Sequence, residues 1–119
     1  MYTILEKYKK FEIKKSQLQD KLGQDLYNVE IESPVEVRAE DVIQAIVKYS
    51  NNDINQQELL NWVNVIWFTD LFVYEEVHEA SISSVIEILE QLDESDFELT
   101  KEDWEKIIYC LRNNIEYNK

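Results

Sequence analysis

The chain has 119 residues, a net charge of −13, and only one Gly, one Pro and one Cys. A chain of this length fits one domain, here residues 1–119. The shortage of Gly and Pro argues against the many tight turns of a β-sandwich or barrel. A hydrophobic content of 45% supplies a core and argues against global disorder. We therefore expect an all-α fold, a compact bundle of four to five helices.

The charge is unevenly distributed along the chain. Residues 1–23 carry six Lys and three acidic side chains, whereas residues 24–119 carry six basic and 22 acidic ones. Such a field attracts basic proteins and repels phosphate backbones and anionic membranes. We therefore expect a basic protein partner, with no direct nucleic-acid or membrane binding and an unknown oligomeric state. An acidic coat that only maintains solubility is the alternative interpretation.

No apolar run reaches the length of a signal peptide or a transmembrane helix, and the single Cys110 cannot form a disulfide within the chain. Both observations favour a cytoplasmic protein.

The N-terminal third contains helical spacing followed by an alternating segment. Residues 1–26 are expected to be helical with uncertain breaks, because apolar residues recur at helical spacing and Gly23 could end a helix. Residues 27–37 alternate apolar and polar side chains around Pro34. This pattern fits an extended connector or a short edge strand, since Pro cannot donate to a β-ladder. We favour the extended connector.

The following helices have clear boundaries. An apolar stripe that starts at Ala39 ends in the turn cluster 50–53. Asn55 then serves as an N-cap with Glu58 at the third helical position, and Thr100 with Asp103 repeats this device for the last helix. Two apolar faces are expected to point inward: Val77, Ile82, Val85, Ile86, Leu89 and Leu92 in the penultimate helix, and Ile107, Ile108, Leu111 and Ile115 in the last.

Evidence for enzyme chemistry is weak. His78 could act as a base oriented by Glu75 or Glu79, but the available nucleophile, Cys110, lies on another helix without an elbow or oxyanion motif. The acidic segment 93–98 lacks the ligand spacing of an EF-hand. One Cys and one His supply no zinc motif. We expect no enzymatic activity, no cofactor and no metal.

The segment from Trp62 to Glu79 combines aromatic and acidic residues, the usual anatomy of a binding hot spot. Trp62 and Trp67 could instead fill the core. Our candidate partner-binding residues are the carboxylates and one aromatic side chain that follow this helix, together with a second acidic group: Asp70, Tyr74, Glu75, Glu76, Glu79, Asp93, Glu94 and Asp96.

Residues 37–62 contain a helix, a short Asn/Asp turn and the start Ile-x-x-x-Glu-Leu-x-x-Trp, at Ile54, Glu58, Leu59 and Trp62. This pattern resembles small acidic helical immunity proteins that accompany bacterial polymorphic or contact-dependent toxins. The resemblance implies stoichiometric inhibition of a toxin domain, often a basic nuclease. It supplies no contact residues, because the matching positions are structural, and residues 72–76 depart from it. A phage-type DNA mimic that blocks a host defence nuclease is the alternative.

Overall fold

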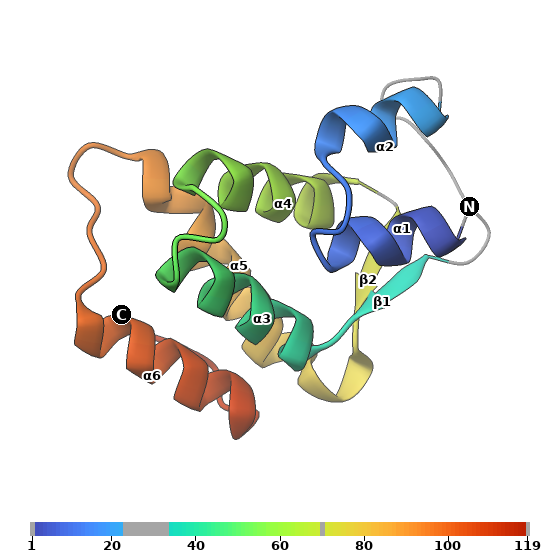
Figure 1. Cartoon of the computed structure of the whole chain (residues 1–119). Helices are drawn as coiled ribbons and strands as arrows, with labels where there is room; N and C mark the ends of the chain where they lie inside the picture. Colours follow the sequence, from blue (N-terminus) through green and yellow to red (C-terminus); the bar gives the residue numbers. More distant parts are fainter. Residues whose placement is uncertain (1, 23–33, 70, 119) are drawn as a thin grey trace.

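The computed structural model describes residues 2–22, 34–69 and 71–118. Within these ranges the chain is predominantly helical, as expected, and it also contains a small sheet (Figure 1). The elements in chain order are α1 (Tyr2–Lys9), α2 (Lys15–Leu22), β1 (Val35–Val37), α3 (Ala39–Ser50), α4 (Gln56–Phe68), β2 (Phe72–Tyr74), η2 (Glu76–His78), α5 (Glu79–Leu89), η3 (Glu90–Asp93) and α6 (Lys101–Arg112). The described ranges thus hold six α-helices, not four or five, because the N-terminal region forms two.

The sheet corrects the expectation of an all-α fold with an extended connector. β1 pairs in parallel with β2, with Val35 opposite Phe72 and Val37 opposite Tyr74. Val35 and Val37 are buried while Glu36 is exposed, so the alternation seen in the sequence is that of a strand. Pro34 stands just before the first paired residue, where its missing N–H costs no ladder bond. The rest of the predicted connector, residues 27–33, lies outside the described residues.

The predicted helix starts are confirmed at α4 and α6. The N–H of Glu58 donates to Oδ1 of Asn55 over 2.8 Å, and the N–H of Asn55 donates to Oε1 of Glu58 over 3.1 Å. At α6 the same reciprocal bonds join Thr100 and Asp103, at 3.1 and 2.9 Å. Each pair satisfies two backbone donors that a helix start otherwise leaves unpaired.

Three helices end in the same left-handed turn. The residue in the turn has a φ of 64° at Phe11, 63° at Asn52 and 53° at Asn114. After each one, the next backbone N–H donates to the carbonyl five residues earlier, over 2.8, 2.8 and 2.9 Å, which is the main bond of a Schellman cap. Asn tolerates this conformation, whereas Phe is strained in it. The Phe11 ring stacks on Trp62, with centroids 5.4 Å apart, and this contact holds the strained turn in place.

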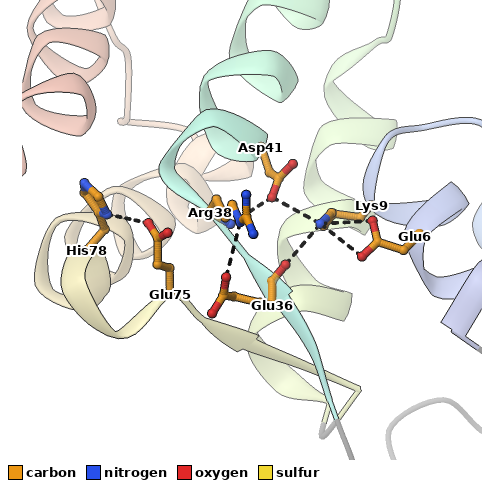
Figure 2. Close-up of polar contacts among 7 residues, drawn as sticks. All are labelled: Glu6, Lys9, Glu36, Arg38, Asp41, Glu75 and His78. Carbon is orange, nitrogen blue, oxygen red and sulfur yellow. Dashed lines mark hydrogen bonds and ion pairs between the residues drawn. The ribbon is translucent and has the colours of Figure 1, made fainter.

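A buried lysine joins α1 to the β1–α3 unit. The Lys9 side chain is 7% exposed, and its Nζ donates to the carbonyl oxygen of Glu36 over 3.1 Å. The same ammonium forms ion pairs with Asp41 at 3.3 Å and Glu6 at 3.2 Å (Figure 2). Because three oxygens from α1, β1 and α3 surround this charge, its burial is compensated.

Two residues expected to point inward are exposed. Val77 is 72% exposed because it lies in η2, before α5 begins, and Ile115 is 44% exposed because α6 has already ended at Arg112. Helical periodicity does not apply beyond the ends of a helix, so both predictions were wrong.

No α-helix in the described ranges combines the length and apolar character needed to cross a bilayer.

Candidate functional site

The structure separates the predicted binding residues into two groups. Glu75, Glu76 and Glu79 lie where α5 begins. Asp93 ends η3, and Glu94 and Asp96 follow it, beyond the other end of α5 (Figure 1). An 11-residue helix is roughly 16 Å long, so one small contact cannot include both groups. Asp70 lies outside the described residues.

Five of the predicted carboxylates, drawn from both groups, make no side-chain contact with another described residue that would occupy them. Glu76, Glu79, Asp93, Glu94 and Asp96 are exposed, and none of these carboxylates has an ion pair or side-chain hydrogen bond to another described residue. They are therefore available to an external cation.

Tyr74 and Glu75 are less available than predicted. Both side chains are half-buried, and a Glu75 carboxylate oxygen contacts Nδ1 of His78. Burial, with a smaller contribution from the charge of Glu87, raises the pKa of Tyr74 to about 12. Tyr74 therefore stays neutral and belongs to the protein's packing more than to a free contact surface.

An acidic groove, which the sequence analysis missed, joins the α5 helix to the second group. It has a volume of about 560 Å³, and among the described residues its lining includes four carboxylates and no Lys or Arg. Three of these carboxylates, Glu87, Glu90 and Glu94, follow one another along α5 and η3. We call this feature the acidic groove; its principal lining residues are Trp67, Glu87, Ile88, Glu90, Glu94, Glu116 and Tyr117.

Part of this groove could have been found in the sequence. The three-residue spacing of Glu87 and Glu90 places them on one helical face, and Glu94 follows directly after η3. The position of Glu116 in the groove could not have been found in this way, because this residue belongs to the C-terminal tail. That tail is held on α5 by the backbone N–H of Tyr117, which donates to Oγ of Ser84 over 2.8 Å.

The aromatic residues of α4 divide between core and groove. Trp62 is buried, with 1% exposure, so for this residue the core interpretation is confirmed. Trp67 is half-buried and lines the acidic groove. Phe68, 52% exposed, stacks on Trp67 with ring centroids 4.9 Å apart. Half-buried Trp67 therefore adjoins the groove carboxylates, which lie outside the predicted segment from Trp62 to Glu79.

The fold turns the charge asymmetry of the sequence into a spatial one. The lysine-bearing helices α1 and α2 lie on one side of α3 and α4, and α6 with the preceding loop lies on the other (Figure 1). Lys7, Lys10, Lys14 and Lys21 are exposed on the first side. None of the described lining residues of the acidic groove belongs to α1 or α2.

A second groove, of about 430 Å³, contains the predicted His–carboxylate pair. His78 contacts Glu75, not Glu79, and Arg38 and Arg112 line the same groove. Figure 2 shows Arg38 beside Glu36, with Glu75 and His78 on its other side. Cys110 is buried and is not among the lining residues, so no nucleophile of the predicted kind adjoins His78.

Within the described ranges, no three His, Cys, Asp or Glu side chains are grouped so that they could hold a metal ion. Comparison with protein-family models, curated proteins and solved structures finds no match to this chain. The resemblance of residues 37–62 to immunity proteins therefore rests on its sequence pattern.

Proposed function

We propose that this chain is a cytoplasmic, non-catalytic inhibitor that neutralises a basic toxin domain, such as a nuclease, through a stoichiometric complex, as an immunity protein does. The observation that carries the proposal is the acidic groove, whose described lining residues include four carboxylates and no Lys or Arg. The resemblance of residues 37–62 supports the same function.

The chemistry of the groove suits a Lys- or Arg-rich partner. Carboxylates accept charge-assisted hydrogen bonds from guanidinium and ammonium groups, and an aromatic face such as that of Trp67 attracts the same cations. Within the chain, the Lys106 ammonium already lies 5.8 Å from the ring centroid of Tyr117, another aromatic residue of the groove. A basic nuclease whose nucleic-acid site received this surface would be blocked sterically and electrostatically.

Long-range charge would also favour rapid capture of the partner. Complementary fields can raise association rates to about 10⁸–10⁹ M⁻¹s⁻¹ at low salt. Exposed carboxylates beyond the groove, at Glu76, Glu79, Asp93 and Asp96, extend the negative surface along α5.

The test begins with isolation of the partner by cross-linking in the native host, followed by association kinetics over a range of salt concentrations. The groove variant combines Glu87→Gln, Glu90→Gln and Glu94→Gln. The matched control combines Glu12→Gln, Asp20→Asn and Glu40→Gln, which removes the same number of exposed charges elsewhere. We expect the groove variant alone to associate more slowly, with a weaker salt dependence. Equal kinetics for the two variants, or a partner without toxic activity in cells, would contradict the proposal.

A DNA mimic is the second candidate function, and the row of carboxylates along α5 and η3 favours it. In that case the partner is a host defence nuclease that binds DNA at the same surface. Duplex DNA would then compete with the chain for the partner, and the competition would weaken steeply with salt. A toxin gene upstream favours the immunity function, whereas a prophage setting favours the mimic.

A further inference from the structure

The two arginines of the chain and its single histidine line one groove, although they are far apart in the sequence. Arg38 precedes α3, His78 ends η2, and Arg112 ends α6. In a chain with a net charge of −13, the presence of both arginines in one groove is not explained by the proposed binding of a basic partner, because this groove is separate from the acidic groove.

The groove lies where the two parallel strands end. Arg38 directly follows β1 and Glu75 directly follows β2. The carboxyl ends of parallel strands are the usual position of ligand sites in α/β folds, because the loops that leave the strands diverge there. Figure 2 shows the side chains of Arg38, Glu75 and His78 together beyond this edge.

The lining of the groove also has an apolar part. Ala39, Ile43 and Leu111 are at most 8% exposed, while Val47 is 37% exposed. A volume of about 430 Å³ falls within the range of small-molecule sites, ~300–1,000 Å³. A ligand that fits this lining therefore has an apolar body as well as a charged group.

We propose that this groove binds a small organic acid, with one carboxylate held by Arg38 and Arg112 and an apolar body against Ile43 and Leu111. A guanidinium group presents paired donors that match a carboxylate. The Arg112 side chain is exposed and has no ion pair or hydrogen bond to another described residue. Arg38 contacts Glu36 at 3.2 Å, but both side chains are exposed, so this pair is weakly held and can exchange for a ligand.

The acidic residues of the groove restrict the ligand to a single negative charge. Glu40 and Glu75 line the groove as well, and Glu75 is already engaged by His78. A phosphate or polyanion would meet these carboxylates and the negative field of the whole chain. This site does not depend on the proposed inhibitor function.

The test is a titration of the full chain, labelled with ¹⁵N, followed by amide chemical shifts. The probes are 4-phenylbutyrate, its uncharged amide 4-phenylbutyramide, and inorganic phosphate. We expect the carboxylate to shift the amides of Ala39, Ile43 and Leu111, and to bind more tightly than either other probe. If the amide binds as tightly as 4-phenylbutyrate, apolar contact alone accounts for the binding. If phosphate binds more tightly, general attraction of anions accounts for it. Either result overturns the proposal.

Charge variants add a readout that a structural role would not produce. Arg112→Gln should weaken 4-phenylbutyrate binding at least about tenfold, because a charged hydrogen bond is lost. Glu40→Gln should strengthen it roughly twofold, because an exposed like charge is removed. Lys101→Gln, at the other end of α6, is the matched control and should change nothing. If Glu40→Gln and Arg112→Gln shift the affinity in the same direction, the arginines do not bind the carboxylate.

Discussion

The indole Nε1 of Trp62 donates a 3.0 Å hydrogen bond to the backbone carbonyl of Lys9. The bond joins the middle of α4 to the last residue of α1, and the strained Phe11 turn stacks on the same ring. One buried side chain therefore anchors the C-terminal end of α1 and the turn that follows it to α4.

We predict that Trp62→Phe destabilises the protein by about 1–3 kcal/mol, because the Lys9 carbonyl loses its buried donor. The missing volume adds a cavity cost. Urea unfolding, followed by far-UV circular dichroism, measures the loss. Trp67→Phe is the matched control, and its effect should be smaller because Trp67 is half-buried. Equal losses for the two variants would mean that the bond to Lys9 contributes nothing.

The left-handed turn at Asn52 predicts opposite effects for two small substitutions. Asn52→Ala should destabilise by roughly 1 kcal/mol, because Ala has no favourable left-handed conformation, whereas Asn52→Gly should be neutral or stabilising. Asn51 is the neighbouring control, since its φ of −88° is ordinary and Asn51→Ala should have little effect. Thermal unfolding of the three variants checks the order. If Asn51→Ala lowers the stability as much as Asn52→Ala does, the left-handed conformation at Asn52 is not the cause of the loss.

Lys9 and Lys10 are adjacent, but their substitution by Met should change the stability of the protein by different amounts. Lys9→Met leaves Asp41 and the Glu36 carbonyl without the ammonium that now pairs them, so we expect a loss of about 2–4 kcal/mol. Lys10 is exposed, and Lys10→Met should change the free energy of unfolding by less than ~0.5 kcal/mol. Chemical denaturation at low and high salt distinguishes the two, because a buried pair is little screened. A loss at Lys9 that disappears in high salt would indicate a surface interaction instead.

Tyr74 should titrate late in alkali, with a pKa of about 12 that arises first from burial and second from Glu87. The folded pKa lies above the ordinary value of 10.0, so the unfolded chain releases this proton first. The contribution of Tyr74 to stability is therefore complete below pH 10 and is lost as the pH rises towards 12. Ultraviolet titration of tyrosinate should show that Tyr74→Phe removes a transition near pH 12.

Glu87→Gln separates the two causes of this shift. It should lower the pKa of Tyr74 while leaving it above 10, because burial remains. Glu98→Gln, another exposed carboxylate, is the control. An unchanged Tyr74 transition in Glu87→Gln would contradict the electrostatic contribution.

Local features were read from the sequence more reliably than long-range ones. The capping pairs Asn55–Glu58 and Thr100–Asp103 involve residues three positions apart, so their geometry depends only on a helix starting there. The β1–β2 pair joins segments on either side of α3 and α4, and periodicity alone does not identify a partner strand. The alternation at Val35 and Val37 was visible, but with Pro34 it fitted either an edge strand or the extended connector that we favoured.

The candidate binding residues show the same limit. Exposure of Glu76, Glu79 and the Asp93–Asp96 loop agrees with the acidic composition, but their distance from one another follows from the length of α5. Glu116 and the Trp67 ring meet in the acidic groove only because the C-terminal tail folds back onto Ser84.

By itself, the sequence determined the helical character, the helix starts and the unequal charge, because these depend on composition and on contacts between residues a few positions apart. The tertiary structure alone decided that β1 pairs with β2, that Tyr74 and Glu75 are partly withdrawn from solvent, and that Arg38, His78 and Arg112 share one groove. These relationships join distant segments. They exist only when burial of a common core offsets the conformational entropy that is lost when those segments are brought together.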